Sequence, residues 1–102
     1  MKALLVCSGG MSSAIVAKAL QEAAQKQGID LSVTECGTQA FPQEVQNDYD
    51  VALVAPQIRH RYDVLEPAAK EAGVPIALIQ PQGYTPLGGP KLLAQVKELL
   101  SL

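Results

Sequence analysis

The chain has 102 residues, of which 48% are hydrophobic, and this is enough for one small domain with a genuine core. Its formal net charge of −2, with no tryptophan and a single phenylalanine, argues against a nucleic-acid partner. We therefore expect residues 1–102 to form a single domain that does not bind nucleic acid.

No apolar run approaches the length of a membrane span, and Met1 and Lys2 lead directly into the first expected strand. The sequence thus predicts a cytoplasmic protein with no direct membrane insertion, whose two cysteines, Cys7 and Cys36, are reduced. Two cysteines and one histidine do not make a zinc site, so we expect no metal and no cofactor.

The first half of the chain alternates between strand and helix patterns. It predicts an apolar strand at residues 2–6, a helix from about residue 12 to 27, an edge strand at 29–36 and a short helix that starts at Pro42 and carries Val45. Gly28 stands where the first helix should end. The expected buried stripe of that helix is Ile15, Val16, Ala19, Leu20, Ala23 and Ala24.

The second half continues the alternation. It predicts an apolar strand at 51–55, a helix that closes at Gly73, a strand at 75–79, a Pro- and Gly-rich loop at 80–89 and a last helix from about residue 90. We place Pro67 near the first turn of its helix, because proline interrupts a helix interior. The inward faces are expected to be Val64, Leu65, Ala68, Ala69 and Ala72, then Leu92, Leu93, Val96, Leu99 and Leu100.

Regular alternation of strands and helices predicts an α/β fold, in which a parallel sheet is covered by helices on both faces. In such sheets the working site lies beyond the carboxyl ends of the strands. The unusual residues of the chain all fall at those ends, which are Cys7, Cys36 with Gly37, the stretch from Pro56 to Arg59 and the stretch from Gln80 to Tyr84.

The loop after the first strand is the strongest candidate for chemistry. Cys7 is followed by Ser8, Gly9, Gly10, Met11, Ser12 and Ser13. Glycines expose backbone N–H groups and a helix start attracts anions, so this loop favours a thiolate and equally a phosphate on its sulfur. We interpret Cys7 as a nucleophile with its oxyanion cradle in one loop. The alternative is an ordinary core cysteine.

A low-molecular-weight tyrosine phosphatase would have an arginine six positions after this cysteine and an Asp-Pro pair elsewhere. This sequence has Ser13 at that position and no Asp-Pro pair. The loop can hold a phosphorylated cysteine but lacks the arginine that would stabilise its hydrolysis, which favours a phosphocarrier. A phosphatase or arsenate-reductase-like enzyme and a non-catalytic adaptor domain are the alternatives.

Arg59, His60 and Arg61 form the only dense positive cluster. Because Arg59 lies nearest the strand end, we interpret it as a contact for a phosphorylated partner or for the charge of a phosphocysteine; a solvated helix start is the alternative. Tyr84 either covers the same edge or packs within its loop. We interpret Cys36 as structural and assign no role to His60.

These residues resemble the enzyme IIB component of the lactose/cellobiose/chitobiose class of the bacterial phosphotransferase sugar-uptake system. The resemblance covers essentially the whole chain. It is carried by the apolar strand into Cys7, by Gly10-Met11-Ser12 at the helix start, by the stretch from Leu53 to Arg59 and by Tyr84.

The resemblance implies a three-layer αβα fold with a four-stranded parallel sheet in the order 2-1-3-4, similar to low-molecular-weight tyrosine phosphatase. It implies a protein-phosphohistidine–sugar phosphotransferase in which Cys7 accepts a phosphoryl group from a phosphorylated IIA protein. Cys7 then passes it to a cellobiose-, chitobiose- or lactose-type sugar bound to the membrane protein IIC. The loop from Ser8 to Ser13 would bind the phosphate through backbone N–H groups, with serine hydroxyls assisting. The family often has a hydroxyl where this chain has Ala14, so that contact is missing or replaced here.

Overall fold

The computed structural model describes the backbone of residues 1–7 and 11–101 and the side chains of residues 1–7 and 14–101. Its elements are β1 (Lys2–Cys7), α1 (Met11–Lys26), β2 (Ser32–Gly37), α2 (Phe41–Glu44), β3 (Val51–Val54), the 3-10 helix η1 (Pro56–Arg61), α3 (Tyr62–Glu71), β4 (Ile76–Leu78), the 3-10 helix η2 (Pro81–Gly83) and α4 (Gly89–Leu100). Among the described helices, none is long and apolar enough to cross a lipid bilayer.

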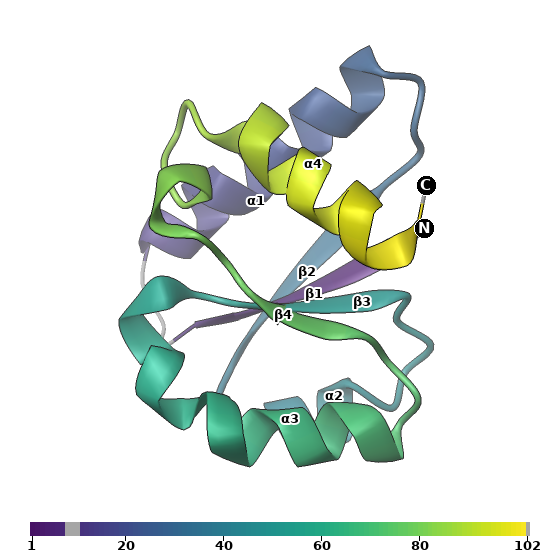
Figure 1. The fold of residues 1–102 in the computed structure, drawn as a ribbon, viewed down its shortest axis with the longest axis vertical. Helices are drawn as coiled ribbons and strands as arrows, with labels where there is room; N and C mark the ends of the chain where they lie inside the picture. Colours follow the sequence, from purple (N-terminus) through teal and green to yellow (C-terminus); the bar gives the residue numbers. More distant parts are fainter. Residues whose placement is uncertain (8–10, 102) are drawn as a thin grey trace.

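The four strands form one parallel sheet in the order β2-β1-β3-β4. Helices α1 and α4 cover one face and α2 and α3 cover the other, which gives three layers (Figure 1). The predicted fold class and strand order are therefore confirmed. β1 lies in the interior of the sheet, whereas β2 is an edge strand, as its alternating pattern predicts.

Alternation of side chains along β1 divides the hydrophobic core between the two faces of the sheet. Ala3 and Leu5 pack in the cluster formed with α1 and α4, whereas Leu4 and Val6 pack in the cluster formed with α2 and α3. None of these four side chains is more than 1% exposed. Burial on both faces fixes β1 firmly, and with it the position of its last residue, Cys7.

Two glycines end helices where the sequence predicts it. Gly28 after α1 and Gly73 after α3 both have a φ of +74°, which lies in the left-handed region that glycine adopts without strain. No atom lies within 4 Å of the place where a Cβ would stand at either position, so the requirement is one of backbone conformation.

Three apolar residues expected in the core lie at the surface instead. Ile15 is 48% exposed, Val64 61% and Leu99 36%, while Ala17 on α1 is buried without having been expected there. The predicted stripes are wider than the helix faces that the sheet covers. Their other members are buried or half-buried as predicted.

Several element boundaries also differ from the prediction; β3 and β4, for example, span Val51–Val54 and Ile76–Leu78, against the predicted 51–55 and 75–79. α3 begins at Tyr62, directly after η1, so Pro67 lies inside the helix, and its expected place near the first turn is wrong. β2 begins at Ser32 instead of residue 29, because the Ile29 amide donates a hydrogen bond of 2.9 Å to the Ala24 carbonyl and closes α1. The short helix α2 has Pro42 in its first turn, as predicted, but it begins one residue earlier, at Phe41, and the buried Val45 follows its last residue.

Candidate functional site at the carboxyl edge of the sheet

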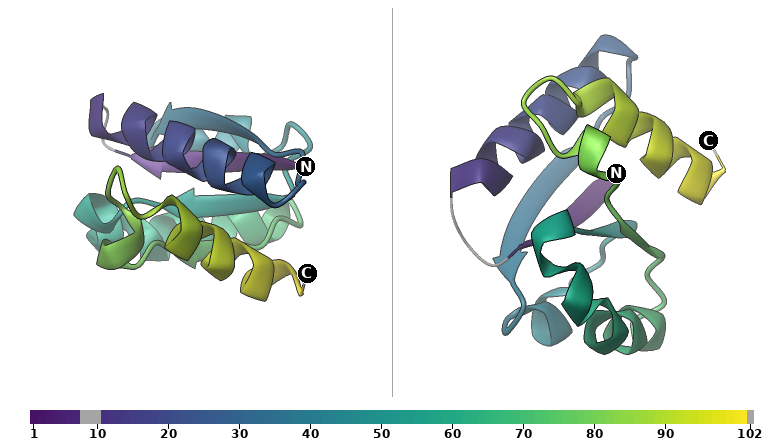
Figure 2. Two further views of the ribbon diagram at one scale, coloured as in Figure 1. Left: turned by 90° about the horizontal axis from the view of Figure 1, so that it is seen from above. Right: turned by 60° about the vertical axis from the view of Figure 1, so that its left-hand side comes forward.

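Cys7 is the last residue of β1 and lies at the carboxyl edge of the sheet. It pairs with Gly37 of β2, and Val6 before it pairs with Val54 of β3. The Cys7 side chain is 7% exposed and packs in the core cluster on the α2 and α3 side. In the left view of Figure 2, the end of β1, the start of α1 and the turn after β3 lie at one end of the molecule, opposite the two termini.

The residues predicted to bind phosphate follow Cys7 directly. Outside the described residues lie Ser8, Gly9 and Gly10, together with the side chains of Met11, Ser12 and Ser13. The backbone of α1 begins at Met11, so a helix N-terminus follows Cys7 closely in the chain. The N–H groups and the dipole at a helix N-terminus favour anions. The phosphate cradle itself stays a prediction.

Cys36 lies on β2 beside the end of β1, where its backbone pairs with Val6. Burial, joined by the negative charge of the nearby Glu44 and by Cys7, raises the pKa of the Cys36 thiol to about 12. A thiol with this pKa stays protonated at neutral pH and is a weak nucleophile. The environment of Cys36 therefore fits a structural residue.

Arg59 and Tyr84, the two residues predicted to contact a partner, are brought together by the structure. Both line a cavity of about 300 Å³, whose other walls are Pro56, Gln57 and Pro81. The walls come from the turns that follow β3 and β4, so the cavity lies at the same edge of the sheet as Cys7. Arg59 is exposed and Tyr84 is half-buried. A guanidinium next to a phenol is suited to bind an anionic or polar group.

A second cavity, of about 360 Å³, lies between η1 and the segment that follows β2. It is lined by Thr38 and Gln39, which follow β2, and by Gln57, Ile58, His60 and Arg61 of η1. The sequence pattern alone does not single out Thr38 or Gln39 as site residues, whereas Arg61 belongs to the predicted positive cluster. Thr38 and Gln39 follow β2 directly and Arg61 ends η1, which follows β3, so this cavity lies at the same edge of the sheet as Cys7.

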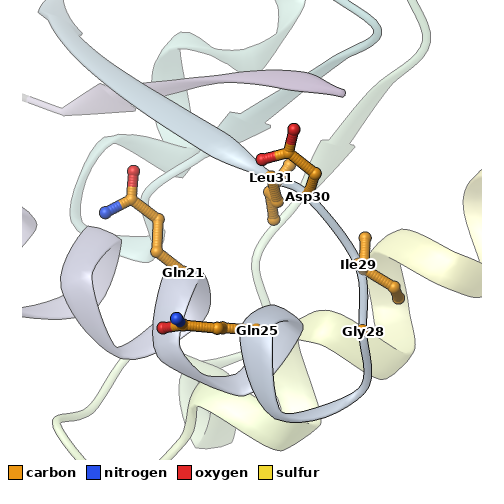
Figure 3. A pocket seen from close by; sticks show the side chains of 6 residues that line it. All are labelled: Gln21, Gln25, Gly28, Ile29, Asp30 and Leu31. Atoms are coloured by element: carbon orange, nitrogen blue, oxygen red, sulfur yellow. The ribbon is translucent and has the colours of Figure 1, made fainter.

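A larger cavity, of about 470 Å³, lies away from Cys7. Figure 3 shows its lining side chains, which come from the second half of α1 and from the segment that leads into β2: Gln21, Gln25, Gly28, Ile29, Asp30 and Leu31. No thiol and no cation is among these lining residues. The two smaller cavities are the better candidates for a functional site, because they share the edge of the sheet where Cys7 lies.

Comparison with known proteins gives a consistent result over most of the chain. Residues 2–95 match the family model described as "PTS system, Lactose/Cellobiose specific IIB subunit". The chain is 29% identical over 101 residues to the PTS system galactose-specific EIIB component of Lactococcus lactis subsp. cremoris (strain MG1363), which covers 95% of this chain and 94% of the relative. It is also 28% identical over 97 residues to the PTS system lactose-specific EIICB component of Streptococcus mutans serotype c, which covers 93% of this chain but only 17% of that longer protein.

A solved structure extends the similarity to the fold. The lactose-specific IIB component domain of the phosphoenolpyruvate:carbohydrate phosphotransferase system from Streptococcus pneumoniae superposes with a TM-score of 0.82 at 27% sequence identity. The superposition covers 96% of this chain and 95% of the other.

Proposed function

Because the chain belongs to the lactose/cellobiose-specific IIB family of the phosphotransferase system (PTS), we propose that Cys7 is its phosphoryl carrier. The chain is a sugar-specific IIB component of the lactose/cellobiose type, and IIB components are phosphotransferases. In the proposed reaction, Cys7 accepts a phosphoryl group from a phosphohistidine of a IIA protein and passes it to a sugar held by the membrane protein IIC. Residues 1–102 act as one IIB domain on the cytoplasmic side of the membrane.

The place of Cys7 is the observation that carries this proposal. It ends an interior strand, whose neighbours on both sides hold it at the carboxyl edge of the sheet. A helix begins at Met11, so the backbone N–H groups of residues 8–13 are the natural donors for a phosphoryl group on the sulfur. In the same turn-rich edge, Arg59 and Tyr84 line a cavity that would contact the partner or the phosphoryl charge.

Two in-line displacements complete the reaction. In the first, the Cys7 thiolate attacks phosphorus while the P–N bond of the phosphohistidine breaks and the imidazole leaves. In the second, a sugar hydroxyl attacks phosphorus, the P–S bond breaks, the thiolate returns and the hydroxyl proton passes to a base or to water. Backbone dipoles at the start of α1 stabilise the charge of the transferring group without a metal ion.

Transfer is favoured over hydrolysis by one residue of the loop. Ser13 occupies the position at which a phosphatase of similar fold would have an arginine. Without that guanidinium, attack of water on the phosphocysteine loses the donor that would stabilise its transition state. The phosphoryl group then persists on Cys7 until the sugar arrives.

A IIC partner is supported by the longer relative. The name of that relative, lactose-specific EIICB component, indicates a IIC and a IIB part, and the present chain matches only 17% of its length. In that relative the two parts belong to one chain. We propose that the IIB domain described here likewise works together with a IIC part.

Phosphorylation by a matched donor tests the proposal. The wild-type protein, Cys7→Ser and Cys36→Ser are each incubated with a histidine-phosphorylated IIA protein of the lactose/cellobiose type, and their intact masses are measured. We expect the wild type and Cys36→Ser to gain one phosphoryl group and Cys7→Ser to gain none. Normal phosphorylation of Cys7→Ser would refute the proposal. Turnover of an aryl phosphate by the wild type alone would favour the phosphatase alternative.

A further inference from the structure

The cavity between residues 38–39 and η1 lies across the carboxyl end of β1. One wall begins at Thr38, directly after Gly37, which pairs with Cys7. The other wall is η1, which starts directly after Ala55, whose amide donates a hydrogen bond of 2.9 Å to the Val6 carbonyl. The first wall therefore adjoins Cys7 through Gly37, and the second adjoins Val6 through Ala55. The cavity therefore lies at the same edge of the sheet as Cys7, between the segments that follow the two strands flanking β1.

The described lining of this cavity is polar and locally positive. Ile58, which is 4% exposed, forms its apolar part, and a hydroxyl, two amides, an imidazole and a guanidinium complete it. No carboxylate is among these lining residues, although the whole chain has a net charge of −2. Arg61 and His60 are exposed, and within the described residues no hydrogen bond or ion pair engages the Arg61 side chain.

We propose that this cavity docks carboxylate side chains of the phosphoryl-donor protein, with Arg61 as the main charge contact. The inference rests on the proposed function, because it concerns the protein that delivers the phosphoryl group to Cys7. A guanidinium binds a carboxylate with two parallel hydrogen bonds, and the hydroxyl of Thr38 and the amide of Gln39 supply further donors on the opposite wall. Its volume of about 360 Å³ falls within the size range of ligand cavities.

The donor protein is the occupant that the geometry favours. Its phosphohistidine has to reach the sulfur of Cys7, so its surface must also cover the cavity walls that adjoin β1. The donor also has to find this edge by diffusion, and a localised positive site on an otherwise acidic molecule steers an acidic partner to it. The cavity at Arg59 and Tyr84 lies on the β4 side of the same turn and enlarges this positive edge.

The rate of Cys7 phosphorylation by a histidine-phosphorylated IIA protein tests the inference. Arg61→Gln and the matched control Lys70→Gln each remove one positive charge, and Lys70 lies in the last turn of α3, away from the cavity. At low salt we expect Arg61→Gln to react about five- to tenfold more slowly than the wild type, while Lys70→Gln stays within about twofold. At about 0.5 M salt the difference should largely disappear, because ions screen the attraction.

A charge added on the opposite wall gives an independent check. Gln39→Glu places a carboxylate against the incoming donor and should slow the transfer at low salt. Gln25→Glu, in the cavity away from Cys7, should not. Wild-type rates for both Arg61→Gln and Gln39→Glu at every salt concentration would overturn the docking inference and leave the proposed function intact.

Other occupants give different results. If Arg61→Gln slows only the transfer from Cys7 to the sugar, the cavity belongs to the IIC contact and the inference is wrong. It is equally wrong if Arg61→Gln reduces binding to vesicles of anionic lipid without changing the rate with the donor. Absence of any phosphorylation of the wild type would overturn the proposed function and the docking inference together.

Discussion

The side chain of Gln21 on α1 holds the edge strand β2, because its Oε1 accepts a hydrogen bond of 2.8 Å from the backbone N–H of Val33. β2 has only β1 as its neighbour, so this N–H points away from the sheet and needs a partner elsewhere. We expect Gln21→Leu to lower the free energy of unfolding by about 1 kcal/mol, since it leaves a half-buried N–H unpaired. Urea denaturation followed by circular dichroism measures the loss.

Gln25→Leu is the matched control for this prediction. Gln25 lies one turn further along α1, is exposed and lines the same cavity as Gln21 (Figure 3). Its replacement should change the free energy of unfolding by less than about 0.5 kcal/mol. Equal losses in the two variants would show that the hydrogen bond to Val33 does not stabilise the strand.

The fold is predictable from the sequence because the signals that specify it act locally. The apolar run of β1, the left-handed glycines Gly28 and Gly73 and the alternation of strands with helices each depend on a few neighbouring residues. The exposure of Ile15 and Val64 is not predictable in this way. It depends on how α1 and α3 lie over the sheet, which helical periodicity does not determine.

The candidate site likewise has one part that local sequence predicts and one part that depends on how the strands pair. The sequence predicts that Cys7 and Arg59 lie at one edge of the sheet, because Cys7 ends an apolar strand, Arg59 follows another, and the carboxyl ends of parallel strands share one edge. The cavity that involves Arg61 requires the register of β2 against β1, in which Cys7 pairs with Gly37. That register places Thr38 next to the end of β1, and no pattern in the sequence specifies it.

α4 begins so close to α1 that a methyl group at Gly89 would collide with the backbone carbonyl of Ala19. Because the obstacle is main chain, it cannot move aside as a flexible side chain would. We expect Gly89→Ala to lower the free energy of unfolding by about 1–3 kcal/mol. Adding Ala19→Gly should not restore it, since the carbonyl remains.

Gly37→Ala is the control for this collision, and urea denaturation measures both variants. A Cβ at Gly37 would meet only the carbonyl oxygen of Cys7, at an ordinary contact distance of 3.8 Å. We expect a change of less than about 1 kcal/mol. If Gly89→Ala proves as mild as this control, the two helices are not packed as closely as described.

The Cys36 thiol should make stability depend on pH in the alkaline range. Its pKa is about 12 in the folded protein, against an ordinary value of 9.0, because burial disfavours the thiolate. The folded state therefore holds the proton more tightly, and the resulting stability is fully present below about pH 9 and is lost as the pH rises toward about 12. Between about pH 8 and about pH 10.5, the unfolding free energy of the wild type should fall more steeply than that of Cys36→Ala. Parallel pH profiles of the two proteins would contradict the assigned environment of Cys36.

Pro67 lies inside the continuous helix α3, and its replacement should stabilise the protein. Proline has no N–H, so the Asp63 carbonyl lacks its helical donor, and Pro67 is exposed, so no core packing depends on it. In Pro67→Ala, about 3 kcal/mol gained in the helix is offset by about 1 kcal/mol from the freer unfolded chain, which leaves a net gain of about 1–2 kcal/mol. Pro75→Ala lies outside any helix and should be neutral or slightly destabilising, because only the unfolded-chain effect acts there. Thermal and urea denaturation of the two variants compare the signs. A loss of stability in Pro67→Ala would instead mean that the proline sets the junction between η1 and α3, and with it the placement of the turn beside Cys7.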